Sequence, residues 1–177
     1  MIKIIAIIGV IAVVAVAAIL AYATTRPDTF RVQRATSIKA PPEKISPHLG
    51  DFHAWNAWSP WEKMDPELKR TFSGAASGKG AIYAWEGNKK VGKGRMEITD
   101  ASPSKIAIKL DFIEPFEGHN VTEFTLEAKG DSTSLTWTMS GPAPFITKVM
   151  QVFVSMDAMI GKDFEAGLAS LKALAEK

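Results

Sequence analysis

Apolar residues in the last part of the chain, residues 145–177, recur at steps of three and four, which is the pattern of one face of an α-helix. These positions are Val149, Phe153, Met156, Ile160, Phe164, Gly167, Leu171 and Leu174. Polar residues fall between them, so the apolar face has to be covered by other elements. The pattern predicts one uninterrupted amphipathic helix, and its Phe- and Met-rich first half favours a partly open interior beneath it.

The stretch that begins at Ile4 and ends at Ala23 carries no charged side chain. A helix of this length rises about 30 Å, which is the thickness of the hydrocarbon core of a bilayer. We therefore expect a single-pass transmembrane anchor in residues 1–25 and a folded domain over residues 26–177. The small residues on either side of Tyr22 also fit a signal peptide that is cleaved near Ala23, which would export the domain. The positions of Lys and Arg leave the side of the membrane undetermined.

Period-two alternation between residues 30 and 38 predicts a first β-strand. The residues Pro41, Pro42 and Glu43 then favour the start of a short helix, because proline fits the first turn of a helix. The segment 51–66 predicts a second short helix that carries three tryptophans at helical spacing, Trp55, Trp58 and Trp61.

Six further segments have strand-like patterns and are separated by turn residues. They cover residues 68–73, 81–86, 91–99, 105–113, 121–128 and 134–140. The order of elements predicts an α+β fold, in which a seven-stranded antiparallel curved sheet wraps around the long C-terminal helix, with two short helices after the first strand. A sheet curved in this way leaves space under the helix, so we expect a hollow domain.

Three local sequences carry a family resemblance. They are Ala40-Pro41-Pro42-Glu43 after the first strand, Asp51-Phe52 with the run Trp55-Asn56-Ala57-Trp58-Ser59-Pro60-Trp61, and Gly161-Lys162-Asp163-Phe164-Glu165-Ala166-Gly167-Leu168 in the last helix. With the order of elements, they make residues 30–175 similar to the SRPBCC superfamily, whose START-like or Bet v 1-like domains have a helix-grip fold. Within it, the chain resembles the bacterial polyketide cyclase/dehydrase-like branch. The resemblance implies a cavity for an apolar or amphipathic small molecule and no particular reaction, since this fold hosts binders, carriers and cyclases.

Composition and motif spacing exclude several kinds of site. The formal net charge is +2 and 23% of the residues are charged, which is typical neither of a nucleic-acid-binding protein nor of a disordered one. The chain has no cysteine, and His48, His53 and His119 are not spaced as metal ligands, so we expect no metal and no cofactor. The basic residues beside one predicted turn are interpreted as solvated, with weak contact to anionic lipid headgroups as the alternative. They are Lys89, Lys90, Lys93 and Arg95.

Three side chains are candidates for acid–base catalysis, namely Glu86, Asp111 and His119. A carboxyl group inside an apolar cavity has a raised pKa and can donate a proton, while a histidine can accept one. The same residue types are common in solvated loops and on the polar faces of strands. We therefore assign no catalytic residue.

Aromatic and other large apolar side chains from separate elements are expected to meet between the sheet and the last helix and to bind a ligand. They are Trp55, Trp58, Tyr83, Trp85, Phe112, Trp137, Met139, Phe153, Met156 and Ile160. We interpret the chain as a monomeric domain, tethered to a bacterial inner membrane, that binds or carries a hydrophobic small molecule or lipid without catalysis and does not bind nucleic acid. Two alternatives stay open: a cyclase- or dehydratase-like enzyme that uses a buried carboxylate and His119, and a stress-linked protein-interaction domain.

Overall fold

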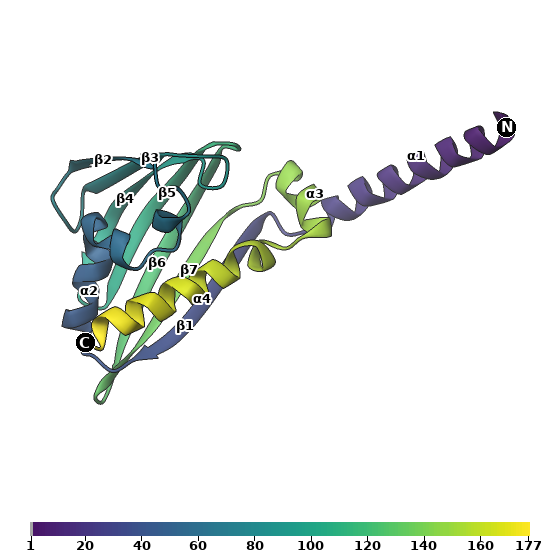
Figure 1. The fold of residues 1–177 in the computed structure, drawn as a ribbon. Helices are drawn as coiled ribbons and strands as arrows, with labels where there is room; N and C mark the ends of the chain where they lie inside the picture. The colour runs from purple at the N-terminus through teal and green to yellow at the C-terminus, as the bar shows by residue number, and fades with distance from the viewer. Residues whose placement is uncertain (1) are drawn as a thin grey trace.

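The computed structural model describes residues 2–177, which form a long N-terminal helix followed by an α+β domain (Figure 1). The helices are α1 (Ile2–Thr24), α2 (Pro42–Gly50), α3 (Phe145–Phe153) and α4 (Met156–Ala175), and two short 3₁₀ helices are η1 (Phe52–Ala57) and η2 (Trp61–Lys63). The strands β1 to β7 span Thr29–Ile38, Lys69–Gly74, Ala81–Glu86, Lys93–Ser102, Lys105–Glu114, Gly118–Lys129 and Ser132–Pro142.

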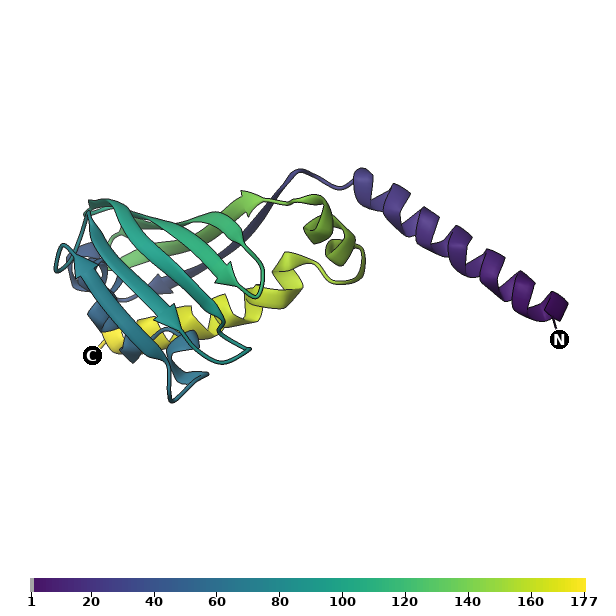
Figure 2. The same ribbon diagram turned by 90° about the horizontal axis from the view of Figure 1, so that it is seen from above.

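All seven strands form one antiparallel sheet in the order β1-β7-β6-β5-β4-β3-β2. The sheet curves, and α4 lies along its concave side (Figures 1 and 2). In β7 the side chains of Leu135, Trp137 and Met139 are buried and alternate with half-buried polar residues, because successive side chains of a strand point to opposite faces. The predicted α+β helix-grip fold is confirmed.

The predicted uninterrupted C-terminal helix is wrong in one respect, because the chain leaves the helical path between α3 and α4. Val154 has an extended backbone (φ −141°, ψ 122°), and Ser155 begins α4 as its N-cap. The Oγ of Ser155 accepts a hydrogen bond from the backbone N–H of Ala158 at 3.1 Å, which satisfies one of the free amides of the first turn. As a consequence, Phe153 does not pack against the sheet and is 70% exposed.

The second predicted short helix, in residues 51–66, is also different from the expectation. It consists of the two 3₁₀ helices η1 and η2, with Trp58, Ser59 and Pro60 between them. Proline disfavours helical geometry in the residue before it, so Pro60 ends any helix that would run through Ser59. The tryptophans of this segment therefore do not share one helical face.

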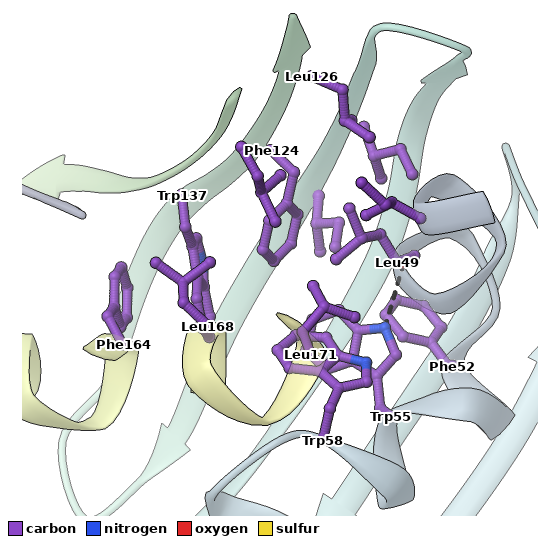
Figure 3. Close-up of a cluster of buried hydrophobic side chains, with 14 of the residues drawn as sticks. Leu49, Phe52, Trp55, Trp58, Phe124, Leu126, Trp137, Phe164, Leu168 and Leu171 are labelled. Carbon is purple, nitrogen blue, oxygen red and sulfur yellow. Dashed lines mark hydrogen bonds between the residues drawn. The ribbon is translucent and has the colours of Figure 1, made fainter. Parts of the chain in front are cut away.

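Aromatic rings make up the centre of the core, as the close-up in Figure 3 shows. The ring of Trp137 on β7 stacks on Phe164 of α4, with centroids 4.0 Å apart and an angle of 8° between the planes. Trp58 packs edge-on against Trp137 at 5.5 Å. The indole nitrogens of Trp55 and Trp58 donate to backbone carbonyls near the end of α2, at 3.1 and 2.9 Å. These bonds attach η1 and the residues after it to α2, and so fix the position of this segment over the core.

The first strand holds α4 in place through Arg34. Its guanidinium donates to Asp157 at 2.7 Å and to Glu165 at 2.6 Å, two carboxylates two turns apart on α4. A Cβ at Gly161 would lie 2.1 Å from Nη2 of Arg34. Glycine at this position therefore lets the helix come close enough to β1 for both ion pairs to form.

Candidate ligand cavity

A cavity of about 250 Å³ lies between the concave face of the sheet, the first half of α4 and the segment η1–η2. Most of its wall is aromatic or aliphatic, and its polar contributors are few. The lining residues are Trp55, Ser59, Trp61, Glu62, Leu68, Tyr83, Trp85, Lys90, Val91, Met96, Leu110, Phe112, Thr122, Trp137, Met139, Ile160 and Phe164.

The exposure of the lining side chains changes from one end of the cavity to the other. At the inner end Trp55, Trp137 and Phe164 are buried. At the other end Trp85, Phe112 and Ile160 are only partly buried, and Lys90 is exposed. The mouth of the cavity therefore lies where β3 and β5 end, beside the first turns of α4.

One hydrogen-bonded group interrupts the apolar wall. Glu62 lies in η2, and its side chain is 8% exposed. Its carboxylate accepts a hydrogen bond from the hydroxyl of Tyr83 at 2.6 Å and another from Nε–H of Arg70 at 2.6 Å. Burial raises the pKa of Tyr83, and the hydrogen bond to Glu62 raises it further. The same carboxylate raises the pKa of Arg70 through its hydrogen bond. The group therefore joins one carboxyl side chain to one phenol and one guanidinium.

Seven of the ten predicted ligand-binding residues line this cavity, and their role in binding stays a prediction. They are Trp55, Tyr83, Trp85, Phe112, Trp137, Met139 and Ile160. The other three lie elsewhere. Trp58 is buried in the core, Met156 packs against the edge of the core, and Phe153 is exposed on α3 because the helix breaks after it.

The three acid–base candidates lie on the outer face of the sheet. Asp111 and His119 sit opposite each other on β5 and β6 and meet at 2.8 Å, but the neighbours of Asp111, Leu110 and Phe112, point into the cavity, so Asp111 points away from it. Glu86 likewise follows the cavity residue Trp85 and is half exposed.

Salt bridges to neighbouring side chains explain the pKa shifts of these three residues. Lys69 and then Lys93 lower the pKa of Glu86. Burial raises the pKa of Asp111, but hydrogen bonds from His119 and Lys109 outweigh it, and the net shift is downward. The hydrogen bond to Asp111 raises the pKa of His119. They form surface ion pairs, and none of the three reaches the cavity.

Tyr83 was predicted from the sequence as an aromatic residue of the cavity wall, but its polar partners Glu62 and Arg70 were not. The three residues come from η2, β2 and β3, and no local motif joins them. The available signal was the position of Glu62 directly after Trp61, within a segment otherwise rich in tryptophan. Within residues 2–177, no three side chains of His, Asp or Glu converge in a way that could hold a metal ion.

Fold and cavity together define the class: a helix-grip domain with an internal apolar cavity. A family model described as polyketide cyclase / dehydrase and lipid transport matches residues 29–176. The chain belongs to this family, and the resemblance to the SRPBCC superfamily is confirmed.

Solved structures of other proteins share the fold. The Zhui aromatase/cyclase from Streptomyces sp. R1128 is 16% identical, with 84% of this chain and 94% of that chain covered at a TM-score of 0.61. The Aha1 dimer from Colwellia psychrerythraea is 19% identical, with 83% and 96% covered at 0.60. A crystal structure of a Chromobacterium violaceum protein is 18% identical, with 86% and 99% covered at 0.57. At these identities the likeness establishes the fold alone, and no curated protein has a significant match to this chain.

The N-terminal helix has the length and composition of a membrane span. The candidate segment is Lys3–Thr24, and its side chains are exposed except near its C-terminal end, where Ala23 is buried and the helix packs against α3. A signal sequence has the same properties, so this helix is a candidate for either role.

Proposed function

We propose that this protein is a membrane-anchored domain that binds or carries a hydrophobic small molecule, lipid- or polyketide-like, without catalysis. The observation that carries this proposal is the apolar cavity of about 250 Å³ under α4, with the Glu62–Tyr83–Arg70 group in its wall. Membership of a family that includes lipid transport is consistent with it.

The size and lining of the cavity restrict the ligand. Sites for drug-sized ligands have roughly 300–1,000 Å³, so this cavity suits a small molecule or one end of a longer chain that leaves through the mouth. Aromatic and aliphatic walls favour an apolar body. The carboxylate of Glu62 has further lone pairs, and the Tyr83 oxygen can accept a hydrogen bond. A ligand with one hydroxyl group on an apolar body fits both features.

The composition of the wall argues for binding rather than catalysis. Glu62, Lys90 and Tyr83 are the ionisable residues among those that line the cavity, and Glu62 is already engaged by Arg70 and Tyr83. A cyclase mechanism would need a carboxylate and His119 in the cavity. The pair that His119 forms with Asp111 lies on the opposite face of the sheet. General acid–base catalysis needs its groups within hydrogen-bonding distance of the reacting atoms.

The test is to isolate the full chain from membranes in polymer-bounded bilayer discs and to identify bound compounds by native mass spectrometry. Two variants separate cavity binding from bilayer background: Ile160→Trp fills the mouth, while Lys162→Trp places the same ring on the exposed side of α4. We expect an apolar compound with wild type and Lys162→Trp that is lost with Ile160→Trp. Equal compound profiles for the two variants, or no bound compound in either, would contradict the proposal.

A further inference from the structure

Helix α3 has most of its large apolar side chains on the outside of the molecule, with only Val149 and Val152 partly buried, which is unlike the usual arrangement in a water-soluble domain. Ile146 and Phe153 are the most exposed of them, at 60% and 70%. The exposed apolar residues of α3 and the two segments that follow it are Phe145, Ile146, Met150, Phe153, Val154 and Met159. Ile146, Met150 and Phe153 are four and three residues apart and so share one face of α3. An exposed apolar face of this kind is typical of a site that another apolar phase covers.

The polar residues of α3 face inward, toward the junction with α1 and with the segment before β1. Lys148 forms an ion pair with Asp28, and its side chain is 12% exposed. Gln151 is partly buried, with its side-chain nitrogen fully enclosed. Ala23, near the end of α1, is fully buried. The outward apolar face is therefore fixed by the packing of the polar side and is not free to rotate into the domain.

The position of α3 identifies what covers this face. The helix packs against α1 and lies beside its C-terminal end, as both ribbon views show (Figures 1 and 2). When α1 spans a bilayer, its C-terminal end lies at the membrane surface, and α3 is held at the same level. An amphipathic helix with outward Phe, Ile and Met side chains is suited to lie in that interface.

The mouth of the cavity lies at the same end of the sheet as α3. Pairing of Thr29 with Pro142 puts the start of β1 beside the end of β7, and the pairs Gly118 with Phe112 and Lys93 with Glu86 bring the ends of β5 and β3 to this edge. Two features of the nearby loops fit a lipid surface. Phe116, between β5 and β6, is 65% exposed, and the loop between β3 and β4 carries Lys89 and Lys90.

We propose that α3 is a membrane-surface helix, whose outer face lies in the lipid interface beside α1 and turns the mouth of the cavity toward the bilayer. The occupant of the exposed apolar surface is thus lipid and not a protein partner. This inference rests on the proposed function in one respect, the membrane span formed by α1. It adds a fixed orientation of the domain, so that a ligand passes between bilayer and cavity at the end of the sheet that α3 holds against the lipid.

The depth of individual α3 side chains in the bilayer can be measured with spin labels. The chain has no cysteine, so one introduced cysteine carries the only label. The full chain is reconstituted in vesicles of phosphatidylcholine and phosphatidylglycerol as the variants Ile146→Cys, Phe153→Cys and Asp131→Cys. Asp131 lies at the tip of the β6–β7 hairpin, at the opposite end of the sheet, and is the aqueous control. Collision with oxygen, which dissolves in lipid, is compared with collision with a water-soluble nickel complex.

We expect the ratio of oxygen to nickel accessibility to be several-fold higher at residues 146 and 153 than at residue 131. Equal ratios at all three positions would overturn the proposal, and so would low accessibility of both agents at residues 146 and 153, because that result indicates burial against protein. The outcome is independent of the ligand test. Lipid contact with an empty cavity would leave the inference standing and remove the proposed function, while aqueous labels with a ligand-filled cavity would do the reverse.

Discussion

Replacement of Tyr83 by phenylalanine isolates the polar group of the cavity, because it removes one hydroxyl group and leaves the ring in place. In the wild type this hydroxyl donates to Glu62 at 2.6 Å. A hydrogen bond to a charged group contributes about 1.5–3 kcal/mol to stability. Glu62 keeps its bond to Arg70 in the variant, so we take the lower end of this range, about 1.5 kcal/mol. With a urea m-value of about 2 kcal/mol per molar, the midpoint should fall by roughly 0.7 M.

The pH dependence of this loss has a definite sign. The folded-state pKa of Tyr83 is raised above its usual value of about 10, since burial and Glu62 both disfavour the phenolate. Its contribution is therefore fully present below pH 10 and is lost as the pH rises toward the folded-state value. The difference in unfolding free energy between wild type and Tyr83→Phe should be constant from neutral pH to pH 10 and should narrow above it.

Urea unfolding of the full chain in lipid nanodiscs, followed by tryptophan fluorescence, measures both quantities, because all five tryptophans lie between residues 55 and 137. Tyr22→Phe is the matched control, since Tyr22 is exposed on α1, and it should stay within about 0.5 kcal/mol of wild type. A loss below about 0.5 kcal/mol with Tyr83→Phe, or a difference that does not narrow at alkaline pH, would show that the hydrogen bond from Tyr83 to Glu62 does not stabilise the fold.

Three further substitutions test the packing and the surface ion pair, with the same preparation. Gly94→Ala would place a Cβ 2.4 Å from the Trp85 ring and 2.6 Å from a backbone oxygen of Asp111, so overpacking should cost about 1–3 kcal/mol in urea unfolding, and a neutral effect would contradict this geometry. Phe164→Ala removes the ring stacked on Trp137 and should cost about 3–5 kcal/mol, whereas Lys162→Ala on the exposed side of α4 should change stability little; similar losses for both would count against the observed packing. Asp111→Asn should lower the raised pKa of His119 toward about 6.5 in an NMR titration. In the wild type this pair stabilises the fold at low pH, and the stabilisation is lost as the pH rises through the raised pKa, so the variant should lack this pH-dependent contribution. An unchanged pKa of His119 would mean that the pair does not form.

The sheet was predictable because its strands have one buried and one solvent-exposed face. In β5 the residues Ile106, Ile108 and Leu110 are buried and alternate with Ala107 and Lys109, which are not. This alternation identifies a strand without any knowledge of its neighbours. The order of the elements then left few arrangements in which one helix could cover the sheet.

The break between α3 and α4 could not be read from periodicity. Phe153 and Met156 are three residues apart, so the helical pattern continues across Val154 and Ser155 as if no break existed. The decisive feature is the N-cap at Ser155, and serine is also tolerated inside helices. In the folded chain α3 packs against α1 rather than against the sheet, and the periodicity of residues 145–177 carries no information about this tertiary contact.

The polar partners of Tyr83 in the cavity were missed for a related reason. Arg70 and Tyr83 are on neighbouring strands β2 and β3, and Glu62 comes from a 3₁₀ helix that precedes both. Only the register of the hairpin and the path after Pro60 bring the three side chains together. In contrast, the aromatic wall could be anticipated, because large side chains on the inner faces of several strands have to meet under one helix.

The end of the sheet where the chain enters β1 and leaves β7 accounts for the position of the cavity mouth relative to α1. β1 and β7 are antiparallel neighbours with Thr29 opposite Pro142. The chain therefore enters β1 from α1 and leaves β7 toward α3 at the same end of the sheet. The linker from Thr24 to Thr29 reaches about 17 Å when fully extended, at 3.3–3.6 Å per residue. When α1 spans a bilayer, this linker cannot carry that end of the sheet far from the lipid. An apolar ligand that leaves the mouth then meets lipid after a short path, which lowers the cost of exposing it to water.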